Sequence, residues 1–266
     1  MVDTQTGLNR RGFLRLGGYT MASGALRLPK EQTGSAGLPK FVLFDAFPIF
    51  DPRSVKTLVA SAVPDKANEL FDLWRSRIFE YQWLRALSGK YADFESSVEQ
   101  ALQFAARSLQ VTLMPSDAAG LVNAFSNLSV WPDVGSALPA LKSLGVKLGF
   151  LSNMTERMLH TNLQRSGIAQ HFDVVLSTDR VRSFKPDPRA YNLACKELMI
   201  EKEEMLFAAF AGWDAAGAQW FGLPTYWVNR MHAAPEFGVE TEGEGSDLRE
   251  LVKFVYERAG RSVSVA

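Results

Sequence analysis

Four polar sites stand at the ends of apolar runs, and their residue types could perform chemistry. A short apolar run bounded by turn residues predicts a buried parallel strand. Ligands bind just beyond the carboxyl ends of such strands in open α/β sheets. The four sites therefore predict an active site along one edge of a sheet. They are Asp45 after residues 41–44, Ser152 and Asn153 after residues 148–151, Lys185, and Asp214.

Asp45 allows several kinds of chemistry. A carboxylate at a strand end can be a metal ligand, a general base, or a nucleophile that forms a covalent ester. A metal would need further carboxylates nearby, but the residue two positions on is Phe47, so no metal site is predicted. The structural alternatives are that Asp45 only caps a turn, that Ser152 and Asn153 only cap a helix over 155–166, and that Lys185 only starts one.

Strands and helices that alternate along the chain must position these residues. Their order is typical of a parallel sheet with helical crossovers. The predicted strands span residues 41–45, 147–152, 173–177, 205–210 and 224–228. The predicted helices between them span residues 134–144, 155–166, 188–198 and 214–221.

One long interval has helical patterns and no strand pattern. Apolar residues recur at spacings of three and four through residues 70–87, and further helices are predicted over 94–109 and 116–128. We expect an α/β fold, a Rossmann-like parallel sheet flanked by helices, with a helical cap inserted after the first strand. The predicted parts are a tail over 1–38, a core over 39–52 and 131–258, and the cap over 53–130. Residues 232–247, rich in Gly and Glu, are predicted to be a surface loop.

The composition excludes several classes of protein. The 266 residues include 29 Lys plus Arg and 29 Asp plus Glu, so no net charge favours nucleic acid or an anionic membrane as a partner. The single cysteine, Cys195, cannot form an intramolecular disulfide or a cysteine zinc cluster. The three histidines, at 160, 171 and 232, lie too far apart for metal-ligand spacing.

The N-terminal segment differs from the rest of the chain. Arg10-Arg11-Gly12-Phe13-Leu14 precedes a mildly apolar stretch over 16–26 and resembles a bacterial twin-arginine export signal. That stretch is too short and too rich in glycine to span a bilayer, so no stable membrane insertion is expected. The segment predicts a periplasmic protein; the alternative is a basic tail without an address on a cytoplasmic protein.

Residues 41–230 resemble the haloacid dehalogenase superfamily, and within it the L-2-haloacid dehalogenases (haloacid dehalogenase, type II). Phosphatases of the superfamily carry an acid two positions after the nucleophile, where this chain has Phe47. That difference argues against phosphoryl transfer and a Mg²⁺ requirement. The matching stretches are 44–47, 73–75, 80–85, 151–153, 185–187 with Tyr191, 213–218 and 221–230.

The resemblance implies a catalytic role for four residues. Asp45 would attack the halogen-bearing carbon and form an aspartyl ester, which water then hydrolyses to a 2-hydroxy acid of inverted configuration. Lys185 would keep Asp45 ionised and stabilise the oxyanion. Asp214 would orient Lys185 and help to activate water. Ser152 would hydrogen-bond the substrate carboxylate.

The resemblance also implies a set of substrate contacts. Arg75 and Asn153 would stabilise the leaving halide, and the backbone N–H groups of Ala46 and Phe47 would bind the carboxylate. Tyr191 matches a pocket tyrosine of the family, although it could merely pack, and Arg75 could be an ordinary solvated arginine. The apolar wall around the alkyl group would consist of Phe47, Phe79, Phe94 and Trp213, which could instead be plain core.

Two departures from the family pattern affect the chemistry. Pro48-Ile49 replaces a Gly-Thr pair, which removes a hydroxyl and one backbone donor near Asp45. Phe210-Ala211 stands where the family has Ser-Asn, and Ala211 cannot hold the hydrolytic water. Losing one preorganised polar group can cost roughly 100-fold or more in rate. We therefore expect alkylation of Asp45 to survive and ester hydrolysis to be slow.

The predicted function is cofactor-independent hydrolysis of short L-2-haloalkanoic acids by a homodimer. The alternative is a degenerate member of the family that binds small carboxylates or halide without turnover. A phosphatase is the weakest candidate, since Phe47 occupies the place of the second acid.

Overall fold

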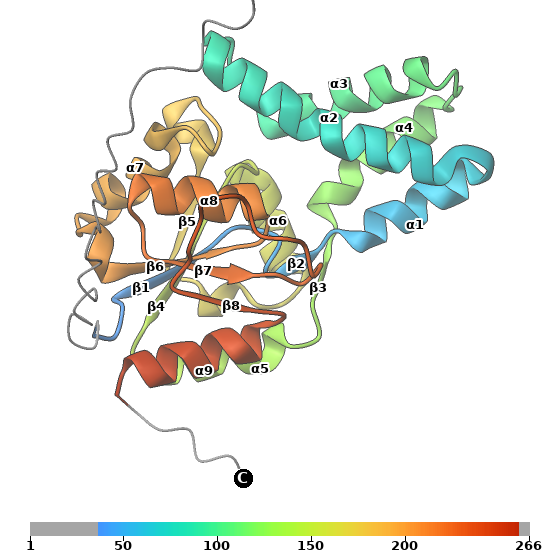
Figure 1. Cartoon of the computed structure of the whole chain (residues 1–266). Coiled ribbons are helices and arrows are strands. Elements are labelled where there is room, and N and C mark those ends of the chain that lie inside the picture. Colours follow the sequence, from blue (N-terminus) through green and yellow to red (C-terminus); the bar gives the residue numbers. More distant parts are fainter. Residues whose placement is uncertain (1–36, 261–266) are drawn as a thin grey trace, which may run out of the picture. The chain divides into compact units, whose positions relative to one another are not determined.

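The computed structural model describes residues 37–260, and the predicted export signal lies outside this part of the chain. The described residues form a parallel sheet with helices on both faces and a group of four helices next to it (Figure 1). Within them, no helix combines the length and the apolar character that crossing a membrane requires.

The central sheet confirms the predicted α/β class. Its six strands are all parallel and follow the order β5-β4-β1-β6-β7-β8. The first five strands in this spatial order each agree with a predicted strand to within one residue at either end. The strands are β1 (Phe41–Phe44), β4 (Lys147–Ser152), β5 (Val174–Ser177), β6 (Met205–Ala209), β7 (Thr225–Val228) and β8 (Gly243–Gly245).

The edge strand β8 corrects the expectation of a loop over 232–247. It pairs with β7 through its backbone, so it needs no apolar side chains to join the sheet. A Cβ on Gly243 would lie 2.9 Å from the ring of Tyr226, and one on Gly245 would lie 2.3 Å from the hydroxyl of Tyr226. The glycines thus allow this close approach, and they also remove the side-chain pattern by which a strand is predicted.

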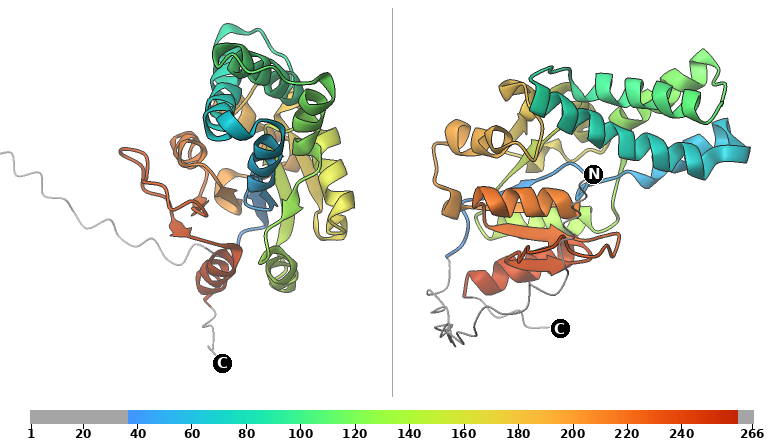
Figure 2. Two further views of the ribbon diagram at one scale, coloured as in Figure 1. Left: turned by 90° about the vertical axis from the view of Figure 1, so that its right-hand side faces the viewer. Right: turned by 45° about the horizontal axis from the view of Figure 1, so that its top comes forward.

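Helices cover the two faces of the sheet. Alternate residues of β1 face opposite ways: Val42 and Phe44 join one hydrophobic core, whereas Phe41 and Leu43 join the other. The first core includes α5 (Val134–Ser143), α6 (Glu156–Arg165) and α9 (Leu248–Arg258). The second includes α7 (Pro188–Leu198) and α8 (Gly212–Phe221). The two groups lie above and below the sheet (Figures 1 and 2).

The interval after β1 contains four helices, which we call the cap. The chain leaves through β2 (Phe50–Asp51) and returns through β3 (Ser129–Val130), and these two strands pair antiparallel. Figure 2 shows the cap helices beside the carboxyl-end side of the sheet. The cap consists of α1 (Arg53–Ala62), α2 (Ala67–Ser88), α3 (Phe94–Ser108) and α4 (Pro115–Asn123).

Local sequence explains where the main cap helices begin and end. Asp93 caps α3 by accepting a hydrogen bond from the backbone N–H of Ser96. Gly89 ends α2 in the left-handed conformation at φ 66°, where glycine has no steric penalty. Trp74, Ile78 and Gln82 recur every four residues on the buried side of α2. That stripe directs one face of α2 toward the core of the molecule.

Candidate active site

Lys185 joins the two carboxylates that the strand pattern brings to one edge. Its Nζ lies 3.0 Å from Oδ1 of Asp45, 2.7 Å from Oδ2 of Asp214 and 3.0 Å from the carbonyl oxygen of Leu151. These three acceptors use all three protons of the ammonium group. The side chains of Lys185, Asp45 and Asp214 are 0%, 12% and 1% exposed, so Asp45 is the member that solvent reaches.

Burial and charge set the ionisation of this cluster. Burial by itself would lower the pKa of Lys185, but the attraction of Asp214 and Asp45 outweighs it, and the pKa of Lys185 is raised. The pKa of Asp214 is raised to about 6. Burial is the main cause, the negative charge of Asp45 adds to it, and the attraction of Lys185 opposes it. Lys185 therefore stays a cation beside Asp45, while Asp214 titrates close to neutral pH.

Tyr191 holds Asp214 in place through its hydroxyl group. Its hydroxyl donates to Oδ1 of Asp214 at 2.8 Å and lies 3.2 Å from the main-chain oxygen of the same residue. A Cβ on Gly217 would lie 2.6 Å from that hydroxyl, so glycine is what lets Tyr191 reach Asp214. Tyr191 is fully buried and does not line the cavity described below. Its predicted contact with substrate is thus not supported, because Asp214 occupies its hydroxyl.

Asn153 is held on both ends of its amide. Its Oδ1 accepts from the backbone N–H of Lys185 at 2.8 Å, and its Nδ2 donates to Oε1 of Gln82 at 2.8 Å. Gln82 is fully buried on α2, so a cap side chain fixes a core side chain. Sequence reasoning assigned no role to Gln82. Its signal is a polar residue on the buried stripe of α2.

The N-cap residues of α6 and α7 show whether the strand-end residues serve only as helix caps. Thr155, not Ser152 or Asn153, caps α6 by accepting from the backbone N–H of Met158. Asp187, not Lys185, caps α7. Asp45 does bind its own turn, since the N–H of Phe47 donates to Oδ2 of Asp45 at 3.4 Å.

A cavity of about 430 Å³ opens beside Asp45, with walls from both the cap and the core. Ser152, Asn153 and the exposed Arg75 also line it. Among the described residues, Arg75 forms no ion pair or hydrogen bond with another side chain, so its guanidinium is available to an anion. The aromatic residues of the walls are Phe47, Phe71, Trp74, Phe79, Trp83, Phe94, Phe125, Phe210 and Trp213.

Most predicted site residues meet at this cavity, but Ala46 and Tyr191 do not line it. Phe47, Phe79, Phe94 and Trp213 line it as expected, and Lys185 and Asp214 lie behind Asp45. Ala46 is fully buried and is not part of the lining, and the contact of its backbone N–H with a carboxylate stays a prediction. The carbonyl oxygen of Ala46 accepts hydrogen bonds from the N–H groups of Ile49 and Phe50, and these bonds fold the loop after Asp45 back on itself.

Distant residues hold the unusual Pro48-Ile49 turn. Arg230 donates to the carbonyl oxygen of Pro48 at 2.8 Å and pairs with Asp133, also at 2.8 Å. Trp131 donates from its indole to the carbonyl oxygen of Phe47 at 2.9 Å. These contacts position the nucleophile without the missing threonine hydroxyl, and the local sequence around Asp45 gave no sign of them.

No cluster of three or more His, Cys, Asp or Glu side chains in residues 37–260 has a metal-binding arrangement. Around Asp45, the ammonium group of Lys185 fills the space between the two carboxylates, which is where a metal cation would lie.

Comparison with known proteins identifies the family. A family model described as haloacid dehalogenase-like hydrolase matches residues 40–222. The chain belongs to the haloacid dehalogenase-like hydrolases. An (S)-2-haloacid dehalogenase of Pseudomonas sp. (strain YL) is 35% identical to this hydrolase over 84% of the chain and 97% of the relative. The haloacetate dehalogenase H-2 of Moraxella sp. (strain B) is 33% identical over 71% and 85%.

Solved structures of similar proteins agree with this family. A crystal structure of an L-2-haloacid dehalogenase has a TM-score of 0.79 to this hydrolase and 35% identity, covering 82% of this chain and 99% of the other. The L-2-haloacid dehalogenase of Xanthobacter autotrophicus with chloropropionic acid covalently bound gives a TM-score of 0.76 and 30% identity, over 82% and 98%.

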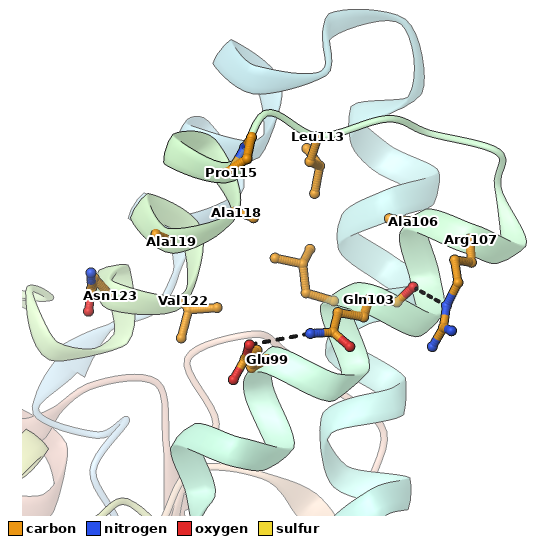
Figure 3. Close-up of a pocket in the computed structure, with 11 residues that line it drawn as sticks. Glu99, Gln103, Ala106, Arg107, Leu113, Pro115, Ala118, Ala119, Val122 and Asn123 are labelled. Atoms are coloured by element: carbon orange, nitrogen blue, oxygen red, sulfur yellow. Dashed lines mark hydrogen bonds between the residues drawn. The ribbon is translucent and has the colours of Figure 1, made fainter.

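The hydrolase has a second hollow of about 600 Å³ inside the cap, between α3 and α4 (Figure 3). Its side chains are partnered locally: Gln103 donates to Glu99, and Arg107 donates to the carbonyl oxygen of Gln103. It shares no lining residue with the cavity beside Asp45. No nucleophile or buried ion pair lies in it, so it is not the reaction site.

Proposed function

We propose that this protein hydrolyses (S)-2-haloacids to 2-hydroxy acids through a covalent ester on Asp45. The observation that carries the proposal is the buried Lys185, which pairs with Asp45 on the floor of a cavity that is otherwise largely apolar. Similarity to (S)-2-haloacid dehalogenases over most of the chain supports the same activity.

In the first step, Asp45 displaces the halide. A carboxylate oxygen of Asp45 attacks C2 from the side opposite the halogen, the carbon–halogen bond breaks, and the halide leaves with both bonding electrons. Arg75 is the cation of the cavity that is free to stabilise the departing halide. Asn153 would do so only by giving up one of its acceptors, because its Nδ2 already donates to Gln82 at 2.8 Å and to the carbonyl oxygen of Lys185 at 3.5 Å. Ser152 lines the cavity and would hydrogen-bond the substrate carboxylate.

In the second step, water attacks the ester carbonyl carbon of Asp45. The bond between that carbon and the ester oxygen breaks, one proton of the water goes to the leaving alkoxide, and the other is released as Asp45 regains its carboxylate. The C2–O bond survives, so the 2-hydroxy acid keeps the inverted configuration. Lys185, 3.0 Å from Oδ1 of Asp45, stabilises the oxyanion. Both oxygens of Asp214 are occupied, by Lys185 and Tyr191, so Asp214 acts as the residue that orients Lys185.

Ester hydrolysis is the slower step in this proposal. Ala211 lines the cavity without a polar group, and Phe210 beside it packs on Phe47 with ring centroids 5.8 Å apart. Neither residue can hold a water molecule. Halide release would therefore show a burst of about one equivalent per site, followed by slow turnover.

The test is halide release from both enantiomers of 2-chloropropionate and 2-bromopropionate, resolved in the first turnover. We expect release from the S form alone, a mass increase on Asp45 during the burst, and no release by Asp45→Asn. Folded protein that releases no halide from either enantiomer but still binds small carboxylates would identify the chain as a degenerate binder and overturn the proposal.

Export and dimerisation complete the proposal. Arg10-Arg11 in the N-terminal segment would send the folded protein to the periplasm, which a cell fractionation with and without Arg10→Lys/Arg11→Lys would test. The cap exposes Leu84, Leu87 and Met114, which are 61%, 90% and 64% exposed. Such residues favour a homodimer through the cap, and light scattering of the purified protein would measure its mass.

A further inference from the structure

The cavity beside Asp45 is large for a short haloacid. Its volume of about 430 Å³ lies within the range of roughly 300–1,000 Å³ that encloses drug-sized ligands. The substrate 2-chloropropionate has only six non-hydrogen atoms. A substrate with a methyl group at C2 would thus leave most of this space filled with water.

The walls are built from aromatic rings that pack in groups. On one side Trp213 packs against Phe79 and Trp83, with centroids 5.4 and 5.5 Å away. In a second group of the lining, Phe125 packs edge-on against Trp74, 5.6 Å away. Because aromatic rings prefer edge-on or offset contacts at these separations, the walls offer ring faces and edges to another ring.

The polar side chains of the outer cavity are occupied by protein partners. Glu80 pairs with Arg77 at 2.7 Å, and the amide of Asn229 binds Ala233 and Glu244. The polar groups of the lining that are left for a ligand are the guanidinium of Arg75, the hydroxyls of Ser76 and Ser152, and the buried indole N–H of Trp83. The ligand that fits has one charged, reactive end and a bulky apolar remainder.

We propose that the site takes 2-haloacids with a bulky apolar group at C2, best an arylmethyl group, in preference to short 2-haloalkanoic acids. This inference rests on the proposed function, since it names the substrate class of the same site. The carboxylate and halogen of such an acid lie at Asp45 and Arg75, and its aryl group lies among Phe79, Trp83 and Trp213.

The first experiment compares (S)-2-bromo-3-phenylpropionate with (S)-2-bromobutanoate. Both acids carry a CH₂ group next to the reacting carbon, so their intrinsic reactivity is similar. We expect kcat/KM to be at least about tenfold higher for the phenyl acid, the factor expected for burying one aromatic side chain. Equal values, or a preference for the butanoate, would overturn the inference while leaving the proposed function intact.

A pair of variants places the effect in the cavity. Phe79→Ala should lower the ratio of the two kcat/KM values at least about fivefold, because the aryl group loses a wall partner. Leu58→Ala in the cap is the control, since Leu58 is 47% exposed and lies outside the cavity. An unchanged ratio in Phe79→Ala would contradict the placement.

Measuring ligand binding without turnover tests the preference for bulky substrates separately from the proposed dehalogenase activity. In Asp45→Asn, 3-phenylpropionate and butyrate can be titrated by the fluorescence of Trp74, Trp83 and Trp213, which line the cavity. Tighter binding of 3-phenylpropionate by about tenfold supports the inference even if no haloacid is turned over. Equal affinities would overturn it even if the enzyme is an active dehalogenase.

Discussion

At the scale of single residues, Lys185 decides what the site can do. A fully buried cation costs free energy unless acidic partners surround it, and here Asp45 and Asp214 both do. In the proposed mechanism Asp45 becomes an ester and loses its charge, so Lys185 keeps only Asp214 as counter-ion. The same event removes the repulsion that helps to raise the pKa of Asp214. Asp214 is thus held as a carboxylate during ester hydrolysis, when the oxyanion needs the ammonium most.

The pH dependence of activity follows from Asp214. Its pKa is about 6, so lowering the pH through 6 protonates it and loosens its hold on Lys185. We expect kcat/KM to fall below about pH 6. Tyr191→Phe removes a hydrogen bond that lowers the pKa of Asp214, so the fall should move to higher pH. A profile that does not move in Tyr191→Phe would contradict this role of Tyr191.

The same group also affects stability. The folded pKa of Asp214 lies above the ordinary value of 3.8, so the folded state binds more protons between those pH values. Its contribution to stability is therefore present at low pH and is lost as the pH rises to about 6, by roughly 3 kcal/mol for two pKa units. Urea unfolding of wild type and Asp214→Asn across this range would measure it as a difference that changes with pH.

At the scale of elements, helix α8 begins without a side-chain cap. Its N-cap residue is Ala211, which also lines the cavity. Ala211→Asn should cap the helix and raise the free energy of unfolding by about 1 kcal/mol. The new amide also provides a polar group for the hydrolytic water, so steady turnover should rise at least about tenfold and the burst should shrink. Ala211→Val is the control for size, and a burst that persists in a stabilised Ala211→Asn would contradict the assigned step.

Helix α2 acts on the core through Gln82. Gln82→Leu removes the acceptor that fixes the Nδ2 of Asn153, and we expect kcat/KM to fall about tenfold, the effect of losing one orienting hydrogen bond. Gln82→Glu keeps an oxygen at that position and should retain more activity than Gln82→Leu. Gln103→Leu is the matched control, because Gln103 bonds only Glu99 on its own helix. An equal loss of kcat/KM in Gln82→Leu and Gln82→Glu would show that Gln82 acts through its packing and not through its hydrogen bond.

At the scale of the whole molecule, the sequence predicted what depends on local patterns. Apolar strands and their parallel order place Asp45, Lys185 and Asp214 at one edge, and the structure brings these residues into contact. Contacts between distant segments carry no such pattern. The bond from Arg230 to Pro48 joins residues 182 positions apart, and the edge strand β8 joins the sheet through backbone pairing with β7.

The same limit applies to roles within the site. Tyr191 was identified as a pocket residue, but its direction depends on the absence of a side chain at Gly217 in another helix. Gln82 was unassigned because a glutamine on a helix is usually solvated, and only the packing of the cap on the core buries it. We propose the division into a core over 39–52 and 131–258 and a cap over 53–130 on the same grounds of packing.

Besides the bond between Gln82 and Asn153, two polar contacts of Tyr91 and Glu95 tie the cap to the core. Tyr91, between α2 and α3, donates to Asp179, and Glu95 on α3 pairs with Arg157 on α6. The ring of Tyr91 also packs on Phe184, 5.3 Å away, next to the catalytic lysine in sequence. In the proposed function substrate binds between cap and core, so these contacts favour the arrangement in which the cavity walls are complete.

Weakening both contacts should therefore weaken substrate binding. A hydrogen bond to a charged group contributes about 1.5–3 kcal/mol and an exposed ion pair about 0–1 kcal/mol, so Tyr91→Phe/Glu95→Gln should raise KM about tenfold or more. The effect on kcat should be smaller, because Asp45, Lys185 and Asp214 all belong to the core. Lys142→Met, which removes an ion pair to Asp173 within the core, is the control. A double variant with unchanged KM and unchanged protease resistance of the cap would show that the cap is held by its apolar contacts alone.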